Sequence, residues 1–332
     1  MMQPLVQRPS IDQPYIFALD VGGKDRVFTG STDSGRASLH HSADARTANP
    51  PAGFKHALLD PRSQNNSPSI RTAIHSDDTV YAAYFSWHQV PVTKAAVVVA
   101  RDNASGTGGA PFTALTDGAD GLPGIRVEKS VPIPWFDFLG QQRVGSALSI
   151  AVDPMDSATV YVAWGEGPKR GSVQTLRVRR STNRGATWSK NRLSVSNATN
   201  PALAITDAGK VGLLYQRLVA NQGQPRWQTH LRITSDGWAT KPGLDIVLAD
   251  TPEDAPTYKF DPYIGDYADL EAVGQDFFGV FSAHNMPDPA NFPYGVVYQR
   301  NHDFGRRLLL DVDQQTIVPE SIDPFFFHLS QL

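Results

Sequence analysis

Short runs in which hydrophobic and polar residues alternate recur along this chain. Each is followed by a turn and a second run rich in β-branched and aromatic residues. The paired runs occupy residues 13–19 and 26–30, 68–74 and 79–84, 146–152 and 159–164, 200–205 and 211–215, and 262–272 and 277–281. Alternation with a period of two is typical of half-buried strands, and Gly, Pro, Asp and Asn between the runs are typical of turns. The pattern therefore predicts a series of similar strand pairs.

Further strand-like runs follow these pairs, at residues 95–100 and 112–115, 175–180 and 193–195, 230–233 and 246–248, and 296–300 and 308–310. Four consecutive strands form the repeating unit of a β-propeller blade. No amphipathic helical segment separates the strands, which disfavours a parallel α/β fold. An immunoglobulin-like sandwich would not repeat in units of four strands. We therefore predict an all-β propeller built from four-stranded antiparallel blades.

One loop in this series has a specific composition, from Ser181 to Trp188. Ser181 and Asn183 carry short polar side chains that can bond the N–H groups of the loop itself. Gly185 permits a backbone conformation with positive φ, and Trp188 supplies a large apolar ring. Strand-like runs flank the loop on both sides. The segment is therefore predicted to be a hairpin with Trp188 buried beside it.

The spacing in this loop resembles the Asp-box of sialidases and related β-propellers, with Asn183 in place of the aspartate. Partial copies lie at residues 31–35, 234–238 and 301–305. The resemblance extends to bacterial sialidase-like proteins with BNR repeats, through residues 263–267 and 285–293. It implies one propeller domain over residues 1–332. It also implies that the box is a folding element away from the reaction site.

Sialidases of this kind have six blades, whereas five are readable here between residues 11 and 313. Six are favoured, because residues 321–327 are apolar enough to form a closing strand of a sixth blade. Alternatively, an N-terminal blade is lacking. Residues 103–142 are rich in Gly and Pro and are expected to form a long irregular connection, of the kind that often serves as a functional lid.

Composition and charge narrow the functional classes. A net charge of −3 and a pI near 6.3 give no electrostatic preference for nucleic acid or an anionic membrane. No apolar run is long enough to span a bilayer. The chain has 0 Cys, which excludes disulfide and thiolate chemistry. The first ten residues lack the apolar core of a signal peptide, although the resemblance favours an extracellular or periplasmic location.

The candidate site follows from the architecture, because the first strand of each blade lines a central channel. Strand starts and the loops between second and third strands then gather on one face. The residues predicted to bind substrate there are Arg71, Arg143, Arg217, Trp87, Asn200 and Asp266. A planar guanidinium binds a carboxylate through two hydrogen bonds, so Arg71 and Arg143 predict an acidic ligand. The alternative is that these arginines form salt bridges with carboxylates of a neighbouring blade.

Three residues are candidates for catalysis: Tyr267, Asp12 and Glu166. Tyr267 lies near Glu271, which resembles the tyrosine–glutamate pair that serves as nucleophile in sialidases. The chain lacks the Arg-Ile-Pro motif with which sialidases open. Two functions therefore stay open: a sialidase-like glycoside hydrolase acting on an acidic sugar, and a non-catalytic propeller that binds a glycan or a protein. No cofactor or metal is expected, because His40 and His41 have no third ligand at metal spacing.

Overall fold

A computed structural model describes residues 15–33, 36–47, 53–63, 70–87, 94–133, 147–168, 174–221, 223–255, 264–265 and 267–330. In these ranges the chain is built of β-strands and contains no α-helix. One short 3-10 helix, η2 (Pro289–Asn291), interrupts the strands. Within the same ranges, no helix has the length and hydrophobicity that crossing a membrane requires.

The strands form six antiparallel sheets, four of which have four strands. The first sheet contains β1 (Tyr15–Val21), β2 (Lys24–Asp33), β3 (Arg36–Ser42) and β4 (Lys55–Leu58). The second contains β5 (Ile70–Ile74), β6 (Val80–Trp87), β7 (Lys94–Asp102) and β8 (Ile125–Pro132). The third contains β9 (Leu148–Asp153), β10 (Asp156–Glu166), β11 (Thr175–Ser181) and β12 (Leu193–Ser196). The fourth contains β13 (Ala198–Ile205), β14 (Val211–Asn221), β15 (Gln224–Thr234) and β16 (Leu244–Pro252).

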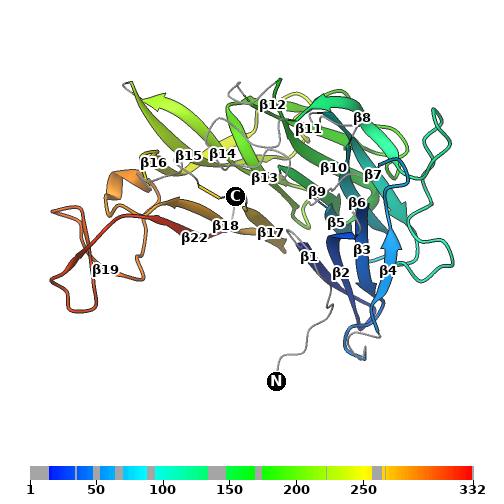
Figure 1. Ribbon diagram of the computed structural model, residues 1–332, viewed down its shortest axis with the longest axis horizontal. Helices are drawn as coiled ribbons and strands as arrows, with labels where there is room; N and C mark the ends of the chain where they lie inside the picture. Colours follow the sequence, from blue (N-terminus) through cyan, green and yellow to red (C-terminus); the bar gives the residue numbers. More distant parts are fainter. Residues whose placement is uncertain are drawn as a thin grey trace.

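The remaining two sheets have three strands each. The fifth sheet contains β17 (Asp269–Val273), β18 (Asp276–His284) and β22 (Ile322–Leu329). A small sixth sheet lies in the connection between β18 and β22, and contains β19 (Asn301–Asp303), β20 (Leu308–Leu310) and β21 (Ile317–Val318). Figure 1 shows the first five sheets radiating from a common centre, with the sixth projecting at one end. This arrangement is a β-propeller, as the sequence pattern predicts.

From the first sheet to the fifth, each sheet shares a hydrophobic core with the next. One cluster around Phe28 and Tyr84 joins the first and second sheets, and another around Phe85 and Trp164 joins the second and third. A cluster around Tyr215 joins the third and fourth sheets, and one around Phe281 joins the fourth and fifth. The stabilising apolar burial is therefore distributed over four sheet-to-sheet interfaces rather than gathered in one centre.

The structure confirms the predicted strand pairs but changes two of the outer strands. Residues 112–115 do not form a strand, and the fourth strand of the second sheet is β8, inside the segment expected to be irregular. Phe112 instead has a φ of 60° and is buried in the loop before it. Residues 296–300 are likewise not a strand. The place beside β18 is taken by β22, the segment expected to close a sixth blade.

The hairpin between β11 and β12 is present, with the loop bonds that its composition predicts. The N–H groups of Asn183 and Gly185 donate to the Ser181 hydroxyl, at 3.3 and 2.9 Å. The Thr187 N–H donates to Asn183 Oδ1 at 2.9 Å. Trp188 is half-buried against the core between the second and third sheets, rather than fully buried as predicted, and its indole N–H donates to the Gly185 carbonyl.

The loop after β15 repeats this bonding. Thr234 replaces the serine, and its hydroxyl accepts from the N–H groups of Asp236 and Trp238. Asp236 accepts from the N–H of Thr240 at 3.0 Å, as Asn183 does from the residue four positions on. Two loops of different sequence therefore close on the same pattern, which supports the reading of this segment as a repeated folding element.

Candidate functional site

The first strands of the five radiating sheets surround a small central cavity. Its lining comes from β1, β5, β9, β13 and β17, and includes Tyr15, Phe17, Arg71, Ser149 and Asp269. The enclosed part measures about 60 Å³, which is room for a few water molecules but not for a sugar ring. A larger ligand would therefore lie at the open side of the cavity, and only a small polar group of it would fit inside.

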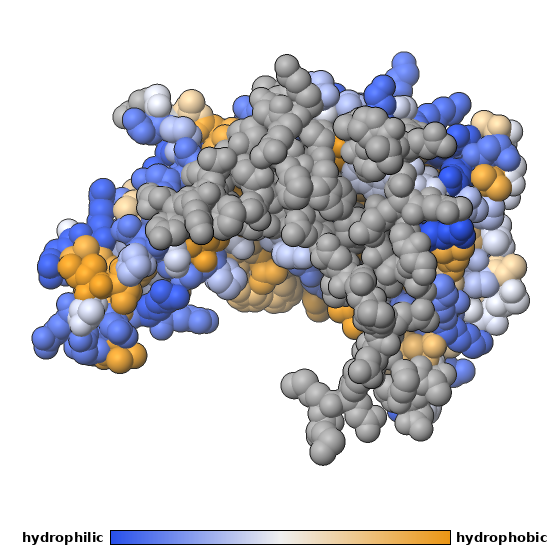
Figure 2. Space-filling view, in the orientation of Figure 1, coloured by the Kyte–Doolittle hydropathy of each residue, from blue (hydrophilic) through white to orange (hydrophobic). Residues whose placement is uncertain are grey.

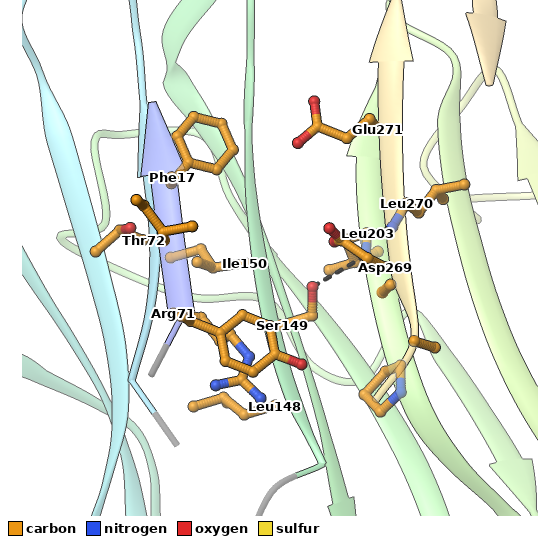
Figure 3. A pocket seen from close by; sticks show the side chains of 15 residues that line it. Phe17, Arg71, Thr72, Leu148, Ser149, Ile150, Leu203, Asp269, Leu270 and Glu271 are labelled. Carbon is orange, nitrogen blue, oxygen red and sulfur yellow. Dashed lines mark hydrogen bonds between the residues drawn. The ribbon is translucent and has the colours of Figure 1, made fainter. Parts of the chain in front are cut away.

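One face of β17 and the residues just before it supplies most of the polar groups. Tyr267, Asp269 and Glu271 alternate along the chain with Ala268 and Leu270, which are buried. Because successive side chains of a strand point to opposite faces, the first three share a face. Figure 3 shows Asp269 and Glu271 pointing into the space across from Phe17 and Arg71. The apolar positions anchor β17 in the core, and the polar ones face the cavity.

Arg71 comes from β5 on the other side of the cavity. Its side chain is almost completely buried, with 7% of the residue exposed. The guanidinium carbon lies 3.1 Å from the centre of the Tyr15 ring, a cation–π contact. Burial lowers the pKa of the Arg71 guanidinium, and Tyr15 and Asp269 oppose that effect. An arginine keeps its charge under such conditions, so a fixed cation stands opposite the carboxylates.

The two carboxyl groups differ in their surroundings. Both face the channel and reach solvent, yet protein atoms enclose them on most sides, and this burial raises the pKa of Asp269 and of Glu271. The Leu270 N–H and Arg71 partly offset the effect on the pKa of Asp269. For Glu271 no such group acts, and the charge of Asp269 raises its pKa further. Arg71 and the Leu270 N–H thus favour the charged form of Asp269, whereas the charge of Asp269 disfavours the charged form of Glu271.

Tyr15 lines the cavity, and Tyr267 lies beside Tyr15 at its edge. Tyr267 is half-exposed, and the centre of its ring lies 6.1 Å from that of Tyr15. Behind them, Asn200 has a φ of 50° and is buried. Its amide donates 2.9 Å hydrogen bonds to Gln216 and to the Gly265 carbonyl. Asn200 thus ties the fourth sheet to the backbone just before Tyr267, which makes it a positioning residue for this edge of the cavity.

The structure places three other predicted residues away from the cavity lining. Trp87 lies in the core between the second and third sheets. Glu166 accepts hydrogen bonds from the Trp164 indole at 3.0 Å and from Arg177 at 2.8 Å. Arg217 lies on β14, where it pairs in register with Ala198 and Gln228. Their roles in substrate binding or catalysis stay predictions.

Three predicted residues, Asp12, Arg143 and Asp266, lie outside the described residues. The structure therefore brings Arg71 and Tyr267 together at the cavity, and adds Tyr15 and Asp269, which the sequence analysis missed. The signal for Asp269 was its spacing of two from both Tyr267 and Glu271. Among the described residues, no group of three or more His, Asp or Glu side chains is arranged to hold a metal ion.

Comparison with known proteins finds only distant likenesses. No family model matches the chain, and no curated protein matches its sequence. Among solved structures, an α-L-arabinanase of Penicillium chrysogenum in complex with arabinobiose is 8% identical, with a TM-score of 0.47, over 82% of this chain and 75% of the other. The α-L-arabinofuranosidase of Fusarium graminearum with arabinobiose is 9% identical, with a TM-score of 0.44, over 83% and 76%.

A Hadza microbial sialidase is 10% identical, with a TM-score of 0.39, over 80% of this chain and 62% of the other. Likenesses this distant assign neither a family nor an activity. The propeller architecture rests on the sheet topology described above, and the function has to be argued from the residues of the cavity.

Proposed function

We propose that this protein is a glycoside hydrolase whose reaction takes place at the open side of the central cavity. The observation that carries the proposal is the pair of carboxyl groups, Asp269 and Glu271, on one face of β17 and opposite Arg71. Most glycoside hydrolases use two carboxyl groups in different protonation states that flank the bond to be broken. The different surroundings of this pair support such a division.

In the proposed reaction, Glu271 donates a proton to the leaving oxygen. Asp269 is ionised, and its carboxylate either attacks the sugar or activates a water molecule that does so. The raised pKa of Glu271 keeps its acid form present at higher pH than an exposed glutamate would. The rate should therefore fall as the pH rises through that pKa. Residues two apart on a strand have Cα atoms about 6.6 Å apart, so both side chains can reach one bond.

The substrate class follows from the charge of the lining. Two carboxyl groups and one arginine, Arg71, come from the described residues of the cavity, a balance that favours a neutral sugar. Exposed sugar rings would contact Tyr267 at the edge of the cavity, because aromatic rings offer apolar faces with polar edges. A neutral glycan such as an arabinose-containing chain is thus the first candidate, in line with the solved arabinanase and arabinofuranosidase structures.

A second candidate is hydrolysis of an acidic sugar, as the sialidase resemblance implies. Tyr267 would be the nucleophile, with Glu271 on the same strand face as its partner, and Arg71 would bind the sugar carboxylate. The common face of these two residues supports this version. A change of Tyr267→Phe would abolish it, but would leave a reaction that depends on Asp269 and Glu271 largely intact.

The test is an activity assay on the whole chain with aryl arabinofuranosides, aryl xylosides, arabinan oligosaccharides and an aryl sialoside. Glu271→Gln and Asp269→Asn should each lower kcat by about 10²–10⁴-fold on the accepted substrate. Asp313→Asn, in an exposed loop near the sixth sheet, is the control and should keep full activity. The anomeric configuration of the product, read by NMR, shows whether Asp269 attacks the sugar or activates water.

Three results would contradict the proposal. Turnover that survives both carboxyl substitutions would place the chemistry elsewhere. Binding of an oligosaccharide, measured by calorimetry, without turnover of any substrate would favour the non-catalytic glycan-binding propeller. If no glycan binds at all, the remaining alternative is a propeller that binds a protein.

A further inference from the structure

A second and larger hollow lies at the outer edge of the fifth sheet. It is a groove of about 960 Å³ between β22 and the chain stretch 292–300, which follows η2. The described residues that line this groove are all different from those that line the central cavity. Ligand-binding pockets commonly measure about 300–1,000 Å³, so the groove has the size of one. It is therefore a candidate binding site separate from the cavity.

The groove is open because β22 has a neighbouring strand on one side only. In each of the first four sheets a fourth strand follows the third, but β22 pairs with β18 alone among the described strands. Residues 296–300 run beside the groove without forming a strand. Phe325, Phe327 and Leu329 of β22 are consequently only partly buried in the core between the fourth and fifth sheets. The floor of the groove is the uncovered end of that core.

Aromatic contacts fix the two walls of the groove to each other. Phe292 and Tyr298 from one wall pack on Phe325 from the other, with ring centres 4.8 and 6.2 Å apart. The Tyr298 hydroxyl also donates a 2.8 Å hydrogen bond to the Met286 carbonyl. The shape of the groove is therefore set before a ligand arrives, and binding would require little ordering of the protein.

Aromatic rings and polar groups occur together on the rim. Tyr294 and Phe326 are 66% and 67% exposed, and Gln299 and Arg300 are exposed on the same wall as Tyr294. Figure 2 shows hydrophobic patches among hydrophilic side chains at the end of the molecule where the sixth sheet projects. The groove thus offers apolar faces and hydrogen-bonding groups to the same ligand.

We propose that this groove binds a neutral oligosaccharide. A sugar ring has an apolar face of C–H groups, which packs on an aromatic ring, and hydroxyl groups at its edge, which bond to polar side chains. The charged groups of the lining are already paired. Arg300 lies 3.7 Å from Asp323, and His328 lies 2.9 Å from Asp276. Since these pairs balance each other's charge, the described lining favours a ligand without charge.

A peptide that adds to β22 as a further strand is the main alternative occupant. Such a peptide binds through a ladder of backbone hydrogen bonds along the edge of the strand. Pro324 lies in β22 and has no N–H, so the ladder would lack a donor there. Proline at the edge of a sheet is one way in which proteins prevent the addition of strands. A glycan is favoured because it binds through side chains and needs no such ladder.

This binding does not depend on the proposed hydrolysis, and it can be measured without turnover. A chain that carries both Asp269→Asn and Glu271→Gln keeps every residue of the groove. Binding to that chain therefore tests the groove, while the activity assay on the unmodified chain tests the hydrolysis. Failure of one proposal can be told apart from failure of the other.

The first test is calorimetry on this doubly substituted chain with arabinohexaose, xylohexaose and cellohexaose. At least one of these neutral hexasaccharides should bind. Tyr294→Ala and Phe326→Ala should each weaken that binding by about threefold to tenfold, whereas Tyr294→Phe keeps the ring and should retain the affinity. The matched control is Met155→Ala, which removes a large apolar side chain that is 74% exposed in the turn between β9 and β10. Circular dichroism verifies that each variant is folded.

A second test locates the bound sugar. Because the chain contains 0 Cys, Tyr294→Cys introduces the only thiol. The hexasaccharide that binds should slow the reaction of this thiol with a maleimide, but not that of Met155→Cys. The proposal is overturned if none of the three hexasaccharides binds, or if the two alanine variants leave the affinity unchanged. Protection of the thiol by a synthetic peptide of alternating valine and threonine, but by no hexasaccharide, would also overturn it and would assign the groove to a protein partner.

Discussion

Two glycines share one backbone conformation and differ in what surrounds them. Gly237 and Gly274 both have a φ of about +62°, which favours glycine over any other residue. A Cβ on Gly237 would lie 2.1 Å from the Tyr161 hydroxyl oxygen, whereas a Cβ on Gly274 would meet no atom within 4 Å. Tyr161 is buried between the third and fourth sheets and packs on Trp238. It cannot move aside without disturbing that interface.

We therefore expect Gly274→Ala to cost about 1 kcal/mol of unfolding free energy, which is the backbone term alone. Gly237→Ala should cost about 2–4 kcal/mol, because overpacking against Tyr161 adds to the same backbone term. Urea denaturation of both variants measures the difference. Equal losses would mean that the Tyr161 ring relaxes freely and that the tight contact has no energetic weight.

Arg71 and Tyr267 could be predicted at the cavity from sequence, while Asp269 and Tyr15 could not. A polar residue next to a hydrophobic run indicates the start of a first strand, and first strands line the channel. The exact face of β17 depends on where the strand begins, and a shift of one residue reverses every side chain. The hydrophobic pattern over residues 262–272 did not fix that start, so Asp269 was assigned no role.

At the scale of the element, the two matching loops provide a test of burial. Trp188 and Trp238 lie in the two matching loops, after β11 and β15, but at different places, because Trp238 takes the position that Gly185 has in the first loop. Trp188 is half-buried, and its indole N–H is bonded to Gly185. Trp238 is buried in the core between the third and fourth sheets.

Trp188→Ala should therefore lower the unfolding free energy by about 2 kcal/mol, because only part of the ring leaves an apolar environment. Trp238→Ala should lower it by about 3–5 kcal/mol, as expected for a buried aromatic ring. Chemical denaturation followed by circular dichroism measures both. The reverse order would show that the loop bonds around Trp188, rather than burial, decide the contribution of this tryptophan.

Strand positions could be predicted where the alternation is strong, and strand partners could not. Residues 296–300 and 322–329 both have strand-like composition, and either could pair with β18 by propensity alone. Phe325 and Phe327 decide the outcome, because they pack against Phe281 and fill the core of the fifth sheet. The choice rests on a contact between residues far apart in the sequence, which local patterns do not record.

At the scale of the whole molecule, the sheets differ in how many neighbours support them. The second sheet has a hydrophobic core on both faces, and its third strand, β7, pairs with β6 and β8. The third strand of the fifth sheet, β22, pairs with β18 alone among the described strands. Both strands hold the same place in their sheets, so they form a matched pair for measuring local stability.

Amide hydrogen exchange should therefore be much slower in β7 than in β22. Exchange requires an amide to be exposed by local or global opening, and opening is easiest where few apolar contacts and few neighbouring strands must be broken. Amides of β7 (Lys94–Asp102) should exchange only through an opening whose free energy is close to that of global unfolding. For amides of β22 (Ile322–Leu329), the free energy of opening should be several kcal/mol lower. Mass spectrometry of peptides that cover the two strands measures this difference. Equal protection in the two strands would mean that the propeller unfolds as one unit, and that the four interfaces between its sheets are coupled rather than independent.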